Sequence, residues 1–134
     1  LMSQIIQPAL DKGIIVIGDR FAESTLAYQG YGRGIDLDVI RTVNTVATGG
    51  LQADLVVLLD LDPQTGLRRK GAGAENDRFE REALDFHQRV RHGYLEMARS
   101  EPRRWLILDA SAPPAAVAKA VWERVRSLMD LRPC

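Results

Sequence analysis

Three short apolar runs, residues 14–17, 55–59 and 105–108, constrain the fold of this chain more than any other feature of its sequence. None of them alternates polar with apolar residues. Continuous apolar runs of this length are typical of strands buried on both faces, as in a parallel sheet covered by helices. We therefore expect each run to be a strand of one parallel sheet.

Helical patterns separate these runs. Apolar residues recur at spacings of three and four in three segments, which are residues 40–47, 79–97 and 117–128. Strands that alternate with helices predict an α/β fold in which helices flank a parallel sheet. A chain of 134 residues is long enough for one such domain, and we expect residues 1–134 to form a single domain.

The composition argues against several classes of partner. Eighteen basic residues balance eighteen acidic ones, so there is no electrostatic case for nonspecific nucleic-acid binding. No apolar run approaches the roughly 18 residues that span a bilayer, so no membrane partner is expected. The single cysteine, Cys134, allows no internal disulfide, which fits a reducing, cytoplasmic location.

An aspartate follows each apolar run: Asp19, Asp60 or Asp109. Ligands of open parallel sheets bind beyond the carboxyl ends of the strands. For Asp60 and Asp109 we favour caps of the following helices or turns over a ligand site. For Asp19 we favour a function, because Arg20 adjoins it. The carboxylate can hold a magnesium-bound water, while the planar guanidinium binds a phosphate through two parallel hydrogen bonds.

The segment around Asp19 and Arg20 closely resembles the nucleotide-binding signature of thymidylate kinases. The matching motifs are residues 7–10, 16–20, 27–30 and 32–34. Further segments resemble the family in the same order, and they are residues 53–60, 76–80, 90–95 and 107–110. The resemblance covers nearly the whole chain and implies a nucleoside monophosphate kinase fold of the phosphate-loop type.

The resemblance assigns roles to individual residues of this segment. It implies that Arg20 binds the phosphate of thymidine monophosphate (dTMP), and that Asp19 lies near the Mg²⁺ ion and the transferred phosphoryl group. Ser24 and Thr25 would face the thymine edge, where a hydroxyl can donate or accept a hydrogen bond. Tyr28 would pack against the deoxyribose and leave little room for a 2′-hydroxyl.

Gln29 and Arg33 are weaker candidates of the same kind, expected in the loop that follows. Simpler alternatives exist for the stronger candidates: Ser24 and Thr25 as helix caps, and Tyr28 as an ordinary half-buried aromatic residue. Taken singly, these alternatives are favoured. Taken together as one ordered set, the residues favour a nucleotide site.

A basic segment at about residues 66–80 corresponds to the mobile lid of the family. Its charged residues are Arg68, Arg69, Lys70, Asp77 and Arg78. The resemblance implies that the lid closes over the phosphates, with Lys70 and Arg78 as candidate catalytic cations. Which of them acts stays open, because residues 71–74 are Gly and Ala where many relatives carry arginine. An equally weighted alternative is a solvated helix end whose cations favour the helix dipole.

The 134 residues contain no Walker A motif, the phosphate-binding loop Gly-x-x-x-x-Gly-Lys-[Ser/Thr]. In thymidylate kinases this loop lies upstream of the segments that this chain resembles, with the first strand of the sheet. We therefore expect a carboxyl-terminal portion of such an enzyme, with the first strands and the Walker A loop missing. We expect it to have negligible kinase activity by itself.

The implied reaction is phosphoryl transfer from ATP to dTMP, which gives thymidine diphosphate for dTTP synthesis, with Mg²⁺ as the cofactor. The resemblance also implies a homodimer built on helices that include residues 35–47. Two alternatives stay open. One is a noncatalytic nucleotide-binding remnant or scaffold, and the other is a kinase for a different nucleoside or nucleotide.

Overall fold

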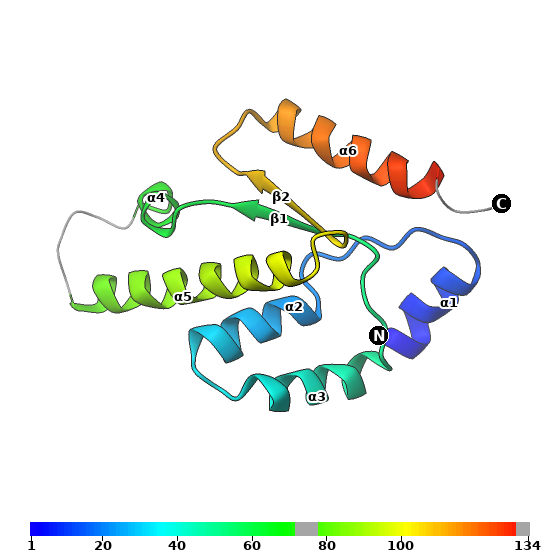
Figure 1. The fold of residues 1–134 in the computed structure, drawn as a ribbon, viewed down its shortest axis with the longest axis horizontal. Coiled ribbons are helices and arrows are strands. Elements are labelled where there is room, and N and C mark those ends of the chain that lie inside the picture. Colours follow the sequence, from blue (N-terminus) through cyan, green and yellow to red (C-terminus); the bar gives the residue numbers. More distant parts are fainter. Residues whose placement is uncertain (72–77, 131–134) are drawn as a thin grey trace. The chain divides into compact units, whose positions relative to one another are not determined.

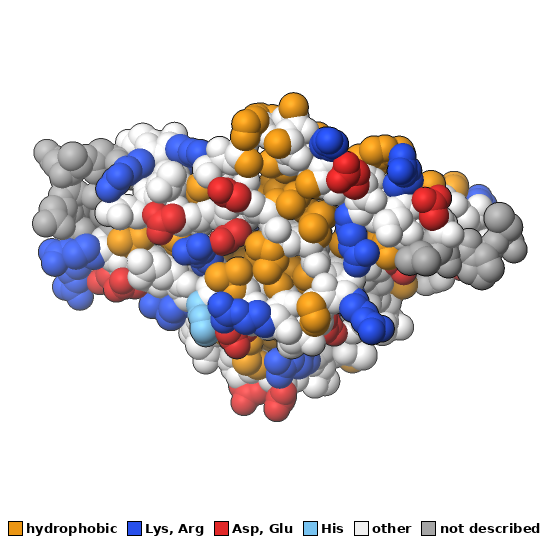
Figure 2. All heavy atoms as spheres, turned by 45° about the horizontal axis from the view of Figure 1, so that its top comes forward, with side chains coloured by type: hydrophobic (Ala, Val, Ile, Leu, Met, Phe, Trp, Pro, Cys, Tyr) orange, Lys and Arg blue, Asp and Glu red, His pale blue; other side chains and the backbone are white. Residues whose placement is uncertain are grey.

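The computed structural model describes residues 1–71 and 78–130, which form two compact units, one within Leu1–Gln52 and one within Ala53–Cys134 (Figure 1). Each unit is described by itself. Among the described residues, no helix is both long and apolar enough to cross a membrane. On the face drawn in Figure 2, acidic and basic side chains are interspersed, which agrees with their equal numbers in the sequence.

Short helical elements make up the first unit. They are the π-helical turn η1 (Met2–Ile6), α1 (Gln7–Asp11), α2 (Ala22–Thr25), the π-helical segment η2 (Leu26–Gly32) and α3 (Leu37–Thr48). Pro8 lies in the first turn of α1, and α1 follows η1 without a break. Helix α2 runs directly into η2, so the two form one continuous helical stretch.

Helix α3 begins and ends at residues suited to those positions. The Asp36 carboxylate accepts hydrogen bonds from the backbone N–H of Asp38 at 2.8 Å and of Val39 at 3.2 Å, which caps the helix. Gly49 ends it in the left-handed conformation, with φ of 63°. The predicted helix over residues 40–47 is therefore confirmed.

Close packing joins α3 to α2 and η2. A Cβ atom added at Gly30 would lie 2.5 Å from Leu37 Cδ2 and 3.3 Å from Ile40 Cδ1, so η2 approaches α3 as closely as only glycine allows. Ile40 is buried at this contact. Asn44 Nδ2 donates a hydrogen bond of 2.9 Å to the carbonyl oxygen of Ala22. These contacts fix α2 and η2 on one face of α3.

The prediction of a strand at residues 14–17 is wrong. The run is not a strand, and its four side chains are 38% to 92% exposed. The Ile14 N–H donates to the Ala9 carbonyl at 3.0 Å, as part of the turn that follows α1. An apolar run becomes a strand only when a neighbouring segment accepts its backbone hydrogen bonds, and no described segment of the first unit pairs with it.

The second unit contains a two-stranded parallel sheet, which confirms the α/β class and two of the three predicted strands. Strand β1 (Val56–Asp60) pairs with β2 (Trp105–Asp109) in a register that places Val56 beside Trp105 and Asp60 beside Asp109. Helices α5 (Arg78–Ser100) and α6 (Pro114–Asp130) lie on opposite sides of the strands in Figure 1, and α4 (Pro63–Arg69) follows β1.

The core of the second unit lies between α5 and the sheet. Val90, Met97 and Ala98 of α5 are buried there, as the spacing of three and four residues predicts. Trp105 at the start of β2 is only 5% exposed and meets Tyr94 of α5 edge to face, with ring centroids 6.4 Å apart. This packing anchors the amino-terminal end of β2 and leaves the carboxyl ends of both strands open.

Candidate functional site

Arg20 and Tyr28 are in contact in the first unit. The Arg20 Cζ atom lies 5.1 Å from the centroid of the Tyr28 ring, within the range of a cation–π interaction. Arg20 Nη2 also donates a long hydrogen bond of 3.4 Å to the Tyr28 hydroxyl. Two residues eight positions apart, both expected at the nucleotide site, are thereby brought together.

The backbone at Arg20 is unusual. Its φ of 69° is the one positive value among the non-glycine residues that the structure describes. The left-handed region is disfavoured for a residue with a Cβ atom, and such outliers gather at functional sites. Asp19 and Arg20 are both exposed. The Asp-Arg pair therefore protrudes from the chain at a turn with a defined, strained backbone.

The neighbouring candidates lie on the helical stretch that begins after this turn. Ser24 and Thr25 belong to α2, one turn before Tyr28 in η2, and Ser24 is half-buried while Thr25 is exposed. The N-cap position of α2 is occupied by Phe21, so neither hydroxyl residue is the amino-terminal cap. The alternative interpretation of Ser24 and Thr25 as helix caps is therefore wrong at this end of α2.

Gln29 differs from its expected place in a loop. It lies within η2, and its Oε1 atom accepts a hydrogen bond of 3.0 Å from Arg33 Nη1. Arg33 is the first residue after η2, and this interaction is exposed. Because the Gln29 carbonyl oxygen is engaged with Arg33, a nucleotide that used it would have to compete with that guanidinium.

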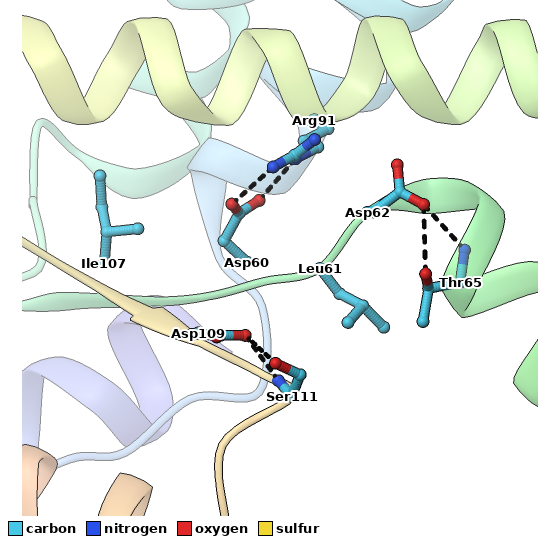
Figure 3. Close-up of a pocket in the computed structure, with 8 residues that line it drawn as sticks. All are labelled: Asp60, Leu61, Asp62, Thr65, Arg91, Ile107, Asp109 and Ser111. Atoms are coloured by element: carbon cyan, nitrogen blue, oxygen red, sulfur yellow. Dashed lines mark hydrogen bonds and ion pairs between the residues drawn. The ribbon is translucent and has the colours of Figure 1, made fainter.

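The second unit holds a hollow of about 480 Å³ at the carboxyl ends of β1 and β2 (Figure 3). Its lining residues come from both strands, from α4 and α5 and from the loops after the strands, and they are Asp60, Leu61, Asp62, Thr65, Arg91, Ile107, Asp109 and Ser111. This edge of a parallel sheet is where ligands are expected. Three carboxylates and one guanidinium line the hollow together with the apolar side chains of Leu61 and Ile107.

Asp60 and Arg91 form a two-pronged ion pair in this hollow. Arg91 Nε donates to Asp60 Oδ1 at 2.8 Å, and Arg91 Nη2 donates to Asp60 Oδ2 at 2.9 Å. These hydrogen bonds hold the pKa of Asp60 below its usual value against the opposing effect of burial, and they raise the pKa of Arg91. Both groups are therefore charged at neutral pH.

The expectation that Asp60 is a cap is wrong, because its carboxylate binds Arg91 of α5 instead. The cap of α4 is Asp62, whose Oδ2 atom accepts hydrogen bonds from Thr65 N at 3.0 Å and Thr65 Oγ1 at 3.2 Å. The sequence analysis did not single out Arg91. The position of Arg91 in the sequence was a usable signal. It directly follows Val90 and lies three residues before Tyr94, on the side of α5 that faces the sheet.

The expectation for Asp109 is confirmed. Its Oδ1 atom accepts hydrogen bonds from the backbone N–H of Ser111 at 2.8 Å and from the Ser111 hydroxyl at 2.6 Å, which closes the turn after β2. These hydrogen bonds lower the pKa of Asp109, and the charge of Arg69 lowers it further.

The described part of the lid segment is basic and exposed. Arg68 and Arg69 end α4, and Lys70 is its C-cap residue, an arrangement that favours the helix dipole. Arg78 begins α5, and its Nε atom donates to Glu82 Oε1 at 3.0 Å. Asp77, together with residues 72–76 of the expected lid tip, lies outside the described residues. The role of this segment stays a prediction.

The donor set around Asp19 fits only one kind of metal site. Within residues 1–71 and 78–130 there is no group of three or more side chains of the types that ligate metals. Mg²⁺ commonly keeps several water ligands and is held by one or two carboxylates together with substrate phosphates. The single exposed carboxylate of Asp19 fits such an ion, and it does not fit a site made of protein ligands alone.

Comparison with known proteins gives one consistent result. The family model of thymidylate kinase matches residues 1–121. The chain is 48% identical over 131 residues to a thymidylate kinase of Desulforudis audaxviator, covering 98% of this chain and 59% of that protein. It is 47% identical to a thymidylate kinase of Solidesulfovibrio magneticus, covering 96% of this chain and 65% of the relative.

A third relative, a thymidylate kinase of Desulfovibrio desulfuricans, is 52% identical over 123 residues, which are 87% of this chain and 57% of that protein. The chain thus spans about three fifths of the length of the curated relatives that it matches. The motifs around Arg20 and Tyr28 and the family match over residues 1–121 lead to the same conclusion: the chain belongs to the thymidylate kinase family.

Proposed function

We propose that this chain carries the dTMP-binding part of a kinase that transfers a phosphoryl group from ATP to dTMP, giving thymidine diphosphate on the route to dTTP. Family membership supports the reaction class. The observation that carries the proposal is the Arg20 guanidinium held over the Tyr28 ring at a strained backbone turn. A fixed, exposed guanidinium is suited to binding a phosphate in two-pronged fashion.

The proposed roles follow from the chemistry of each side chain. Arg20 binds the dTMP phosphate, and Asp19 holds Mg²⁺ through a water molecule near the transferred group. Tyr28 packs against the deoxyribose. The hydroxyls of Ser24 and Thr25, one helical turn before Tyr28, face the thymine edge, and the amide of Gln29, the next residue after Tyr28, is a further substrate contact. Phosphoryl transfer needs such alignment and positive charge more than covalent help from the protein.

We further propose that residues 66–80 form the lid over the ATP phosphates. Its charged residues are Arg68, Arg69, Lys70, Asp77 and Arg78. Lys70 and Arg78 are the proposed catalytic cations, and their places at the carboxyl end of α4 and at the start of α5 support this. The ion pair of Arg78 with Glu82 is exposed, and exposed pairs are weak enough to be exchanged for a phosphate contact.

The proposed fold is that of phosphate-loop nucleoside monophosphate kinases, with residues 1–134 as one incomplete domain. The 134 residues contain no Walker A motif. This loop supplies the backbone amides and the lysine that hold the ATP phosphates. We therefore propose that these residues alone have negligible turnover with ATP and dTMP.

A homodimer in the cytoplasm completes the proposal. Val39, Val43 and Val46 of α3 are 55%, 57% and 80% exposed. Their spacing of four and three residues places them along one side of the helix. A stripe of exposed β-branched side chains supports an interface on α3, because burying it against another subunit removes apolar surface from water.

The test is a comparison of dTMP with thymidine, which has the same base and sugar but no phosphate. Isothermal titration calorimetry should show tighter binding of dTMP, and Arg20→Gln should remove most of that preference. A hydrogen bond to a charged group contributes about 1.5–3 kcal/mol, so the loss should be about ten- to hundredfold. The matched control is Arg41→Gln, which removes an exposed guanidinium of α3 and should change neither affinity.

Equal affinities for dTMP and thymidine in the unaltered chain would contradict the proposal. Titration with uridine and guanosine monophosphates tests the alternative of a kinase for a different nucleotide. A kinase for another nucleotide would bind one of these more tightly than dTMP. A noncatalytic module would bind dTMP but would stay inactive when a complete phosphate-binding half is supplied by a relative.

A further inference from the structure

We propose that Tyr28 is a positioning residue for Arg20, holding the guanidinium in place before any ligand binds. This inference rests on the proposed function in one respect: the anion that the guanidinium receives is taken to be the phosphate of a nucleoside monophosphate. It adds a role to Tyr28 that is distinct from packing against the sugar. Contact with the sugar acts on the ligand directly, whereas positioning acts through Arg20.

Two contacts between the side chains carry the proposal. The ring of Tyr28 lies under the guanidinium at 5.1 Å, and the phenol oxygen accepts a hydrogen bond from Nη2 at 3.4 Å. Together they restrain the Arg20 head group beside the Tyr28 ring. One of its five N–H donors is directed to the phenol, and because Arg20 is exposed the others stay accessible to an anion.

The backbone is an independent second observation. Arg20 has a φ of 69°, in a region that a residue with a Cβ atom rarely adopts. Residues 11–20 are exposed throughout, so little packing around the turn offsets this strain. The contact with Tyr28 ties the strained residue to η2, whose Leu26, Ala27 and Gly30 are buried in the first unit.

The physical advantage of such a contact is pre-organisation. A free arginine side chain loses rotamer freedom when it binds a ligand, and this loss lowers the affinity. When Tyr28 already restrains Arg20, this rotamer freedom is lost during folding and not on ligand binding. The restraint of one long, rotamer-rich side chain corresponds to about three- to tenfold in affinity.

The first part of the test needs no ligand. In the full chain labelled with ¹⁵N-arginine, the Nε–Hε signal of Arg20 is assigned by its loss in Arg20→Lys. We expect a ring-current shift on this signal that persists in Tyr28→Phe and disappears in Tyr28→Leu. The matched control is Tyr31→Leu, which removes another half-buried tyrosine of η2 and should leave the signal unchanged. A signal that is unchanged in Tyr28→Leu would overturn the proposal.

The second part measures affinity for dTMP and for thymidine. Tyr28→Leu should weaken dTMP about three- to tenfold more than thymidine, and this difference should vanish when Arg20 is already replaced by Gln. Equal weakening of both ligands, or additive effects of the two substitutions, would overturn the positioning role. Tyr28→Phe removes only the phenolic hydroxyl and should lower the affinity for dTMP less than Tyr28→Leu does. This variant provides a measurement even if the leucine variant unfolds.

The two parts also separate this inference from the proposed function. A chain that shows the ring-current shift but binds dTMP no better than thymidine would contradict the dTMP site while supporting the positioning of Arg20. A chain that prefers dTMP but shows no shift would support the site and overturn the positioning role.

Discussion

Removal of the Asp60 carboxylate should destabilise the second unit by an amount set by its ion pair with Arg91. Asp60→Asn keeps the size of the side chain but removes its charge and one of its two strong acceptors. The side chain of Asp60 is 21% exposed and that of Arg91 is 38% exposed. The pair therefore lies between exposed pairs, which contribute about 0–1 kcal/mol, and buried pairs, whose disruption costs about 3–5 kcal/mol.

From these limits we expect Asp60→Asn to lower the free energy of unfolding by about 1–2 kcal/mol at pH 7. Water can still reach Arg91 in the variant, which keeps the loss below that of a buried unpaired charge. The assay is urea unfolding followed by circular dichroism. The control is Glu96→Gln, because the Glu96–Arg99 pair lies on the exposed side of the same helix, and it should cost less than about 0.5 kcal/mol.

The stability difference between the unaltered chain and Asp60→Asn should also depend on pH in a defined direction. The pKa of Asp60 is lowered in the folded chain from an ordinary value of 3.8. A carboxylate with a lowered pKa adds stability above its unfolded pKa, and this stability is lost as the pH falls through the folded pKa. The difference between the unaltered chain and Asp60→Asn should be constant from pH 7 to about pH 5 and shrink below about pH 4. A difference that grows in acid, or a loss no larger than that of Glu96→Gln, would refute the reasoning.

Substitutions at three further positions test the packing and the helix capping. Gly30→Ala should cost about 1–3 kcal/mol in urea unfolding, since its Cβ would lie 2.5 Å from Leu37 Cδ2; an unchanged midpoint would contradict this close contact. Trp105→Phe should cost less than about 1 kcal/mol because it also removes the buried, unpaired Nε1 donor, whereas Trp105→Ala should cost about 3–5 kcal/mol; similar losses for both would argue against the orphaned donor. Asp36→Ala should lower the thermal midpoint by removing about 1 kcal/mol of helix capping, and Asp36→Asn should restore most of it.

The sequence correctly predicted the two strands that pair with each other in the second unit. The runs at 55–59 and 105–108 are apolar throughout, and each is the other's partner in the parallel pair. The run at 14–17 has the same composition, yet it forms no strand. Composition indicates that a segment can be a strand, whereas strand formation requires a second segment to pair with it. That requirement is nonlocal and cannot be read from the run itself.

The sequence predicted which residues belong to the candidate site, but it did not predict which of them are in contact. Three aspartates that follow apolar runs look alike in the sequence, but one of them binds an arginine 31 residues away and another closes a turn two residues long. The contact of Arg20 with Tyr28 depends on a left-handed backbone at a non-glycine residue. Nothing in the local residue types favours that conformation, so the sequence could name both residues without showing that they touch.

The most direct measurement of the central claim is a nuclear magnetic resonance titration of the ¹⁵N-labelled chain with dTMP. We predict saturable shifts concentrated at residues 19–29, with the Arg20 side-chain signal among the largest. Shifts that are absent, or that cluster instead at Asp60, Arg91 and Asp109, would contradict the claim that the Asp-Arg turn binds the nucleotide phosphate.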